Sequence, residues 1–320
     1  MAREIQSGEY ELGTHRTLLQ EFWRNFRRNK LSLVGGVIVL FYAFLAVFAP
    51  LLAPYDPIEQ FDAPRGMRNP MPPLSRDEDG RLFLLGTDKF GRDILSRAIY
   101  GTRTLLQVAV GSISIAMLIG VTMGAVAGYR AGTWVDELLM RAVDIMLSFP
   151  SLVLAIALVG AFGIGKIQVG PFTVSNIVKI MLVIAVTYSP RFARVMRAVV
   201  LQEMAKDYVA AARISGASGA RILLTEILPN TIPPIIVQAS LMMATTVLTT
   251  SSLSFLGLGL QPPRPSLGLM LNEARDYLFW GAWWYAVVPG GLITLAILGF
   301  NLLGDGLRDA LDPRQARRRR

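Results

Sequence analysis

Long uncharged apolar runs alternate with polar, charged intervals along the 320 residues of the chain. Two runs, 31–53 and 104–128, are each long enough as a helix to cross the roughly 30 Å hydrocarbon core of a bilayer. Similar runs occupy 145–165, 232–260 and 286–303. The pattern predicts an all-α integral membrane protein in which helices account for nearly all the regular structure.

A sixth span is needed between the third and the last two, and its pattern is the least regular. Lys179 and Arg191 enclose only 11 uncharged residues, so the span must reach back toward Pro171 or forward past Pro190. We expect Lys179 to snorkel to the outer interface. An intramembrane charge is costly, however, and a functional role for Lys179 stays open.

Small and hydroxyl-bearing residues mark surfaces within the predicted spans. Glycines recur every fourth residue at Gly120, Gly124 and Gly128, a spacing that lets another helix approach closely. Pro150 is expected to kink the third span. The fifth span is dense in Thr and Ser, and these side chains suit either close helix packing or an aqueous path. The candidates for lining a path are Thr245, Thr249 and Ser252.

Composition supports a membrane protein and excludes several kinds of site. Hydrophobic residues make up 52% of the chain, charged residues 17%, and the mean hydropathy is +0.45, whereas soluble domains carry about a quarter charged residues. The sequence contains no cysteine, and its one histidine, His15, lies in a polar tail. We therefore expect no catalytic residue, no metal site and no cofactor.

The net charge of +9 is unevenly distributed, with Arg317–Arg320 as a terminal basic run. Basic residues collect in cytoplasmic loops, so this asymmetry predicts that both termini are cytoplasmic. Nucleic-acid binding is a weaker alternative. Most of the Lys and Arg residues fall in the intervals predicted to face inward, which are 1–30, 129–141, 191–230 and 304–320.

The remaining polar intervals have distinct predicted roles. The 1–30 tail, with aromatic and basic residues interleaved at its end, suits an amphipathic helix on the inner leaflet. The Pro-rich 54–103 interval is expected to be external, a loop with short surface helices. The 261–282 interval is expected to be an external excursion with a short helix before the last span. Aromatic residues expected to form an interfacial belt there are Trp280, Trp283, Trp284 and Tyr285.

The 203–230 interval reads as two helices joined by a tight turn between membrane spans. Its first helix is expected to carry one face made of Met204, Tyr208, Ala211 and Ser215. Gly216 is expected to end that helix and Ser218 to cap the next, whose end or kink falls at Pro229. Such an interval is either a docking surface or a plain amphipathic connector.

The same interval resembles the cytoplasmic "EAA" loop of ABC-importer permeases. The matching strings are Tyr208-Val209-Ala210-Ala211-Ala212-Arg213, Gly216, and Leu228-Pro229-Asn230. The Glu of the motif's name is replaced by Ala210, and Glu203 and Asp207 are the acids nearby. The resemblance implies that the loop couples to ATPases through Asp207, Tyr208, Ala211, Ala212, Arg213, Gly216, Ala217, Ser218, Leu228 and Pro229.

A second string, LGTDKFGRDILSRAIYGTR at 85–103, resembles permeases of the dipeptide, oligopeptide and nickel branch. Thr87 or Asp88 is expected to cap a helix that starts near Lys89. Ion pairs at helical spacing are expected among Arg92, Asp93 and Arg97. We interpret the string as a structural cap over the span ends in preference to a substrate contact.

These resemblances identify the chain as a second, C-type permease subunit of a peptide-family ABC importer. They imply six transmembrane helices in the type I importer fold with cytoplasmic coupling helices, in a prokaryotic inner membrane. The implied partners are a second homologous permease, two ABC ATPases and an extracytoplasmic substrate-binding protein. The implied cargo is di- or oligopeptides, with nickel chelates or oligosaccharides as alternatives.

Two rival classes lack the residues they need. An ion-coupled secondary transporter would want acids or histidines within the spans, which offer only Asp144 and Lys179. A membrane-embedded enzyme would want clustered acids, histidines or a Ser/Lys pair. The 160–166 string matches GxxxxGK, but Ile167 stands where a phosphate loop has Ser or Thr, so ATP chemistry is expected from another chain.

Overall fold

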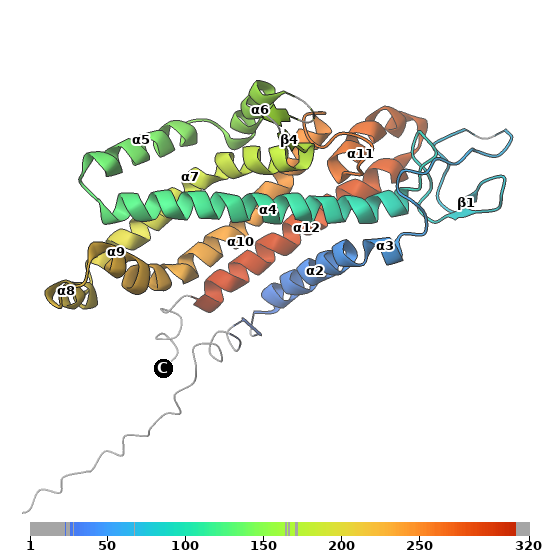
Figure 1. Ribbon diagram of the computed structural model, residues 1–320. Coiled ribbons are helices and arrows are strands. Elements are labelled where there is room, and N and C mark those ends of the chain that lie inside the picture. The colour runs from blue at the N-terminus through green and yellow to red at the C-terminus, as the bar shows by residue number, and fades with distance from the viewer. Residues whose placement is uncertain are drawn as a thin grey trace, which may run out of the picture.

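The computed structural model describes residues 23, 26–27, 29–66, 68–163, 165, 167–169 and 172–311. Long helices run side by side along one direction and form an elongated bundle (Figure 1). A loop-rich segment that contains β1 (Ser75–Arg76) lies at one end of the bundle, and the short helices α8 (Asp207–Ile214) and α9 (Gly219–Arg221) lie at the other. The described chain is predominantly helical, as the hydropathy pattern predicts.

Five helical stretches are long and apolar enough to cross a membrane in the part of the chain that the structure describes. These are α2 (Lys30–Val47), α4 (Ile94–Tyr129), α7 (Asn176–Met204), α10 (Leu228–Phe255) with the turns before it, and α12 (Trp283–Leu311). The pair α5 (Trp134–Leu147) and α6 (Ser151–Phe162) passes the same test together and is bent by 96°. The count is six when this bent pair is one span.

The bend lies at the place where a kink was predicted, because Pro150 stands between the two helices. Helix α5 ends at Leu147, and Pro150 is the residue before α6. After α6 the chain forms a small antiparallel hairpin of β3 (Ile167–Val169) and β4 (Phe172–Val174). The span predicted at 145–165 is therefore two differently directed helices. The predicted run contains all of α6 but only the last three residues of α5, because the rest of α5 carries Asp136, Glu137, Arg141 and Asp144.

Glycines hold α4 against α7, as the four-residue spacing predicts. A Cβ at Gly124 would overlap the carbonyl oxygen of Ala193, and one at Gly120 would stand 2.5 Å from the Cβ of Phe192. The backbones of the two helices therefore approach closely, and the side chains around them form the larger buried core of the chain.

Helix α7 extends forward through Pro190, which resolves the irregular fourth span. A proline lacks the N–H that would bond the carbonyl of Val186, and the Ser189 hydroxyl donates to that carbonyl at 3.1 Å instead. Lys179 does not snorkel to an interface: its side chain is 3% exposed, and its ammonium donates to the Gly163 carbonyl at the end of α6. It ties α7 to α6 because exposed carbonyls at a helix C-terminus attract a cation.

The 54–91 segment is a compact loop with a two-stranded hairpin, β1 (Ser75–Arg76) and β2 (Leu82–Phe83). Phe61, Met71 and Phe83 are buried together beneath it, with Tyr55 against them. Residues 54–66 and 68–93 contain no helix, so the expectation of surface helices is wrong. The predicted helix start is also wrong: Asp93 caps α4 by accepting from the backbone N–H of Ser96 at 2.7 Å.

A short helix, α11 (Leu267–Ala274), and a 3-10 turn, η2 (Arg275–Trp280), precede α12, as the sequence predicts for this interval. Trp280 and Trp283 are exposed. Tyr285 is fully buried and donates to Glu273 at 3.1 Å, so it does not belong to an aromatic belt. Tyr285 was assigned wrongly because it lies within five residues of two exposed tryptophans.

The beginning of α2 and the end of α12 lie toward the same end of the bundle as α8 (Figure 1). Asn29, the N-cap of α2, donates to Asp309 of α12 at 3.1 Å. Before α2, the rings of Trp23 and Phe26 stack and the Arg27 guanidinium lies over Trp23. Residues 1–22 and 312–320 lie outside the described residues, as do Arg24 and Arg28.

Candidate functional site

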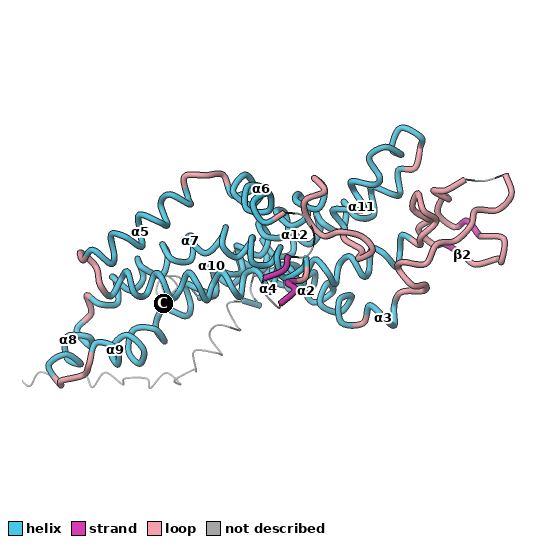
Figure 2. Tube along the Cα trace, turned by 45° about the horizontal axis from the view of Figure 1, so that its top comes forward, coloured by secondary structure: helices cyan, strands magenta, loops and turns pink. Residues whose placement is uncertain are grey.

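The 203–230 loop forms a projection beyond the long helices, made of α8 (Asp207–Ile214), α9 (Gly219–Arg221) and the π-helical turn η1 (Ile222–Ile227). Figure 2 shows α8 and α9 at the extremity of the molecule, far from β2. The predicted order of helix, tight turn and second helix is confirmed. The face predicted for the first helix is wrong, because α7 ends at Met204 and α8 is a new helix.

The turn at Gly216 is a complete Schellman motif. The Ala217 N–H donates to the Ala212 carbonyl at 3.1 Å, and the Gly216 N–H donates to the Arg213 carbonyl at 3.0 Å. Gly216 has a φ of +78°, which an L-residue rarely adopts. Ala212 and Ala217 pack on the same apolar cluster. The matched Ala and Gly positions therefore have a structural reason, which is to end α8 at a fixed angle.

Apolar contacts fix α8 to the rest of the chain. Val209 is fully buried in one cluster with Val200 of α7 and with Ile222 and Ile227 of η1. Gly219 at the start of α9 lies so close to Tyr129 that a Cβ there would overlap the Tyr129 hydroxyl. The loop is thereby seated on the ends of both α4 and α7.

A polar cluster reinforces this seat around the carboxylate of Glu203. Tyr208 donates to Glu203 at 2.8 Å, Lys206 donates to it at 2.6 Å, and Asn230 approaches the Tyr208 hydroxyl at 3.5 Å. Burial and the neighbouring Glu203 raise the pKa of Tyr208 above its ordinary value, so its hydroxyl stays protonated and able to donate. Tyr208 therefore stabilises the loop through contacts within the loop itself.

The two nearby acids have different environments. Glu203 is buried and already accepts two side-chain hydrogen bonds, whereas Asp207 is exposed in the first turn of α8. An acidic side chain in that turn also complements the positive end of the helix dipole. Of these two acids, Asp207 is the one whose side chain lies on the surface.

The outward face of α8 combines small, charged and apolar side chains. Asp207, Ala210, Ala211 and Arg213 are exposed, and Ile214 is 88% exposed. Sequence reasoning missed Ile214. The sequence does place an isoleucine beside a helix-ending turn and outside every predicted span, and this placement could have indicated an exposed apolar residue. Ile214 is thus a large exposed apolar side chain on a face that is otherwise small or charged.

The second half of the loop continues directly into a membrane span. Ser218 caps α9 by accepting from the Arg221 N–H at 3.4 Å. Leu228 then begins α10, and Pro229 is its second residue. Because α9, η1 and α10 follow without a loop between them, a displacement of the projection is carried to α10.

The three candidate path residues occupy different environments on α10. Thr249 is buried, and its hydroxyl lies 2.6 Å from the Tyr188 hydroxyl of α7. Thr245 and Ser252 are half-buried. Thr245 and Thr249 therefore both contact the Tyr188 hydroxyl of α7, which also donates to the Thr245 carbonyl at 3.3 Å.

A polar cleft of about 670 Å³ separates α5 from α7. Asp136 receives both Nε and one terminal nitrogen of Arg197, at 2.6 and 2.7 Å. Arg194 donates to Asp144 at 2.7 Å across the same cleft. No group of three or more potential metal ligands occurs among the described residues.

The sequence and the fold match one family of known proteins. Residues 120–317 match the family described as "Binding-protein-dependent transport system inner membrane component". Residues 17–73 match the "N-terminal TM domain of oligopeptide transport permease C". The solved MetNI methionine ABC transporter, in inward-facing conformations, has a chain that matches with a TM-score of 0.52 and 20% identity, over 68% of this chain and 96% of that chain. This likeness extends to the fold alone.

Curated relatives are similar over nearly their full length. The "Di/tripeptide transport system permease protein DppC" of Pseudomonas aeruginosa is 44% identical over 300 residues, covering 92% of each chain. The "Dipeptide transport system permease protein DppC" of Escherichia coli K12 is also 44% identical, over 93% of this chain and 94% of the relative. The "Glutathione transport system permease protein GsiD" of Pectobacterium atrosepticum is 40% identical, over 93% and 92%.

Proposed function

This chain belongs to the family of binding-protein-dependent transport system inner membrane components, and we propose that it is the C-type permease of an importer for di- and oligopeptides. The names of the relatives that are 44% identical support the cargo, since both are dipeptide or di/tripeptide permeases. The glutathione permease at 40% identity favours a second cargo of the same chemical class, a short peptide.

In this proposal the chain forms half of the translocation path and does no covalent chemistry. A second homologous permease supplies the other half, two cytoplasmic ABC ATPases supply the energy, and an external binding protein delivers the peptide. Helix α8 docks into the ATPase through Ile214, with Asp207 and Arg213 placed to form charged contacts at the rim. Its outward face in the described structure supports this role, because exposed apolar anchors dominate docking energies.

Nucleotide-driven closure of the ATPases would move α8, and the Schellman turn and the continuous α9–η1–α10 segment would carry that movement into the membrane. The orientation that follows places α8 and both termini in the cytoplasm and the 54–91 segment outside. The position of α8, the start of α2 and the end of α12 toward one end of the bundle supports this arrangement.

Reconstitution tests the proposed function. The chain is purified with its second permease and ATPases, placed in liposomes, and supplied with the binding protein and radiolabelled dialanine. We expect ATP-dependent accumulation of the dipeptide, and competition by tripeptides. Nickel chelates and oligosaccharides serve as the comparison cargoes. Accumulation of either of those with no response to peptides would refute the proposed cargo.

A further inference from the structure

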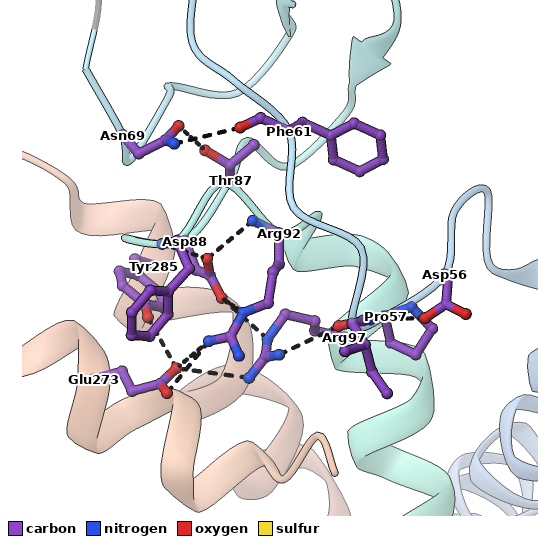
Figure 3. A network of polar contacts seen from close by, with 12 residues as sticks. Asp56, Pro57, Phe61, Asn69, Thr87, Asp88, Arg92, Arg97, Glu273 and Tyr285 are labelled. Atoms are coloured by element: carbon purple, nitrogen blue, oxygen red, sulfur yellow. Dashed lines mark hydrogen bonds and ion pairs between the residues drawn. The ribbon is translucent and has the colours of Figure 1, made fainter. Parts of the chain in front are cut away.

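At the end of the bundle opposite α8, five buried side chains join three distant parts of the chain (Figure 3). The members of this charge network are Asp88, Arg92, Arg97, Glu273 and Tyr285, and all are less than a tenth exposed. The two acids and two arginines balance in charge. None of these contacts was predicted from the sequence, which placed the ion pairs along one helix.

The network binds the 54–91 segment to α4. Arg92 pairs with Asp88 at 2.6 Å, and Arg97 of α4 approaches the same carboxylate at 3.2 Å. Arg97 also donates to the Pro57 carbonyl at 3.2 Å, near the beginning of the segment. Both ends of the segment are therefore fixed to the first turns of α4.

The network also binds α11 to Arg92, the residue that directly follows that segment. Glu273, in the last turn of α11, accepts from Arg92 at 3.1 Å and lies 3.6 Å from Arg97. Tyr285 of α12 donates to the same Glu273 carboxylate. Glu273 is thus the one residue of α11 that contacts both arginines. A buried charge without its partners is costly, so separating α11 from the segment is strongly opposed.

Helix α11 in turn lies directly on α10. A Cβ at Gly268 would overlap the Ser251 carbonyl oxygen and stand 2.8 Å from the Ser254 Cβ. A displacement of α11 therefore displaces α10 through this backbone contact. Since α10 continues into η1 and α9 at its other end, one helix connects the charge network with the loop around α8.

We propose that Glu273 is a positioning residue that makes the 54–91 segment and α11 move together, so that a protein bound outside acts on α10 and hence on the ATPases. This inference rests on the proposed function. It links two sites at opposite ends of the molecule. Such a link requires that each site shift the position of the same movable element. Helix α10, contacted by α11 at one end and continuous with the loop at the other, is that element.

Hydrolysis by the reconstituted complex, measured with and without the binding protein, tests the link. Glu273→Gln removes the charge but keeps the shape, and we expect it to reduce the stimulation by the binding protein about fivefold or more while unstimulated hydrolysis persists. Tyr285→Phe, which removes one hydroxyl, is expected to give a smaller reduction. Tyr277→Phe is the matched control, because its ring packs beside Tyr285 and its hydroxyl has no hydrogen bond within the described residues.

The outcomes separate the inference from the proposed function. A wild-type complex without any stimulation would count against the proposed function itself. Normal stimulation in wild type and in both network variants would overturn only the role of Glu273. Equal loss of stimulated and unstimulated hydrolysis, or failure of both variants to assemble with the partner subunits, would show that the network is merely architectural and would overturn the inference too.

Discussion

At the end of α8, Gly216 has a φ of +78°, and no heavy atom lies within 4 Å of the position that a Cβ would take. Within this chain, therefore, a substitution meets backbone strain but no steric overlap. Gly219, three residues later, is the opposite case, because a Cβ there would overlap Tyr129. Substitutions at Gly216 and at Gly219 therefore distinguish an effect on a docked partner from an effect on the packing of the loop against Tyr129.

Gly216→Asp is expected to abolish uptake while leaving membrane abundance unchanged. The strain costs about 1 kcal/mol, too little to unfold a chain whose spans are untouched, but the added bulk and charge point toward the proposed ATPase. Gly216→Ala is expected to keep part of the activity. Abundance, ATPase copurification and uptake are compared in the same cells.

Gly219→Ala is the comparison variant, and it is expected to lower the thermal stability of the purified chain because the Tyr129 contact must shift. Wild-type uptake in Gly216→Asp would mean that the loop is only a connector. Loss of Gly216→Asp from the membrane would mean that its role is in folding.

The packing of α4 on α7 depends on small residues at close contacts. Gly124→Val is expected to destabilise the chain by about 1–3 kcal/mol, because the added carbons meet the backbone of α7 and neither helix has room to move. Gly160→Ala on α6 is the matched control, since no heavy atom lies within 4 Å of its Cβ position.

Thermal denaturation of the purified chain in detergent, followed by tryptophan fluorescence, measures both variants. The control is expected to denature at the wild-type temperature or slightly above it, because alanine favours the helix over glycine. Equal stability of Gly124→Val and wild type would contradict the close α4–α7 packing.

Several features with a local signal were predicted from the sequence, whereas contacts between distant residues were not. The turn at Gly216, the glycine ridge on α4 and the long apolar helices each depend on residues a few positions apart. The pairing of Arg92 with Glu273 joins residues 181 positions apart, and no periodicity reports such a contact. Likewise, the burial of Lys179 depends on the end of α6 folding back toward α7, which the apolar run alone does not specify.

At the scale of the molecule, the orientation across the membrane follows from where the elements lie. Helix α8 and the ends of α2 and α12 occupy one end of the bundle, and the 54–91 segment occupies the other (Figure 1). The chain has no cysteine, so single introduced cysteines report on each end without interference.

Ser218→Cys is expected to resist an impermeant thiol reagent in intact cells and to react after lysis. Glu78→Cys, on the exposed turn between β1 and β2, is expected to react in both conditions once the reagent has crossed any outer envelope. Both positions are exposed in the structure, so a difference in labelling reports only the side of the membrane on which each position lies. Labelling of Ser218→Cys in intact cells would reverse the orientation.

The whole account depends on α8 being the surface that meets the ATPase, and crosslinking from Ile214 tests that most directly. Ile214→Cys, carrying a photoactivatable thiol reagent in membranes that contain the complete complex, is expected to yield a covalent product with an ATPase subunit. Leu278→Cys is expected to yield none, because it is exposed on η2, which directly follows α11, and Figure 1 shows α11 far from α8. An ATPase product from Leu278→Cys, or its absence from Ile214→Cys in an assembled and active complex, would contradict the account.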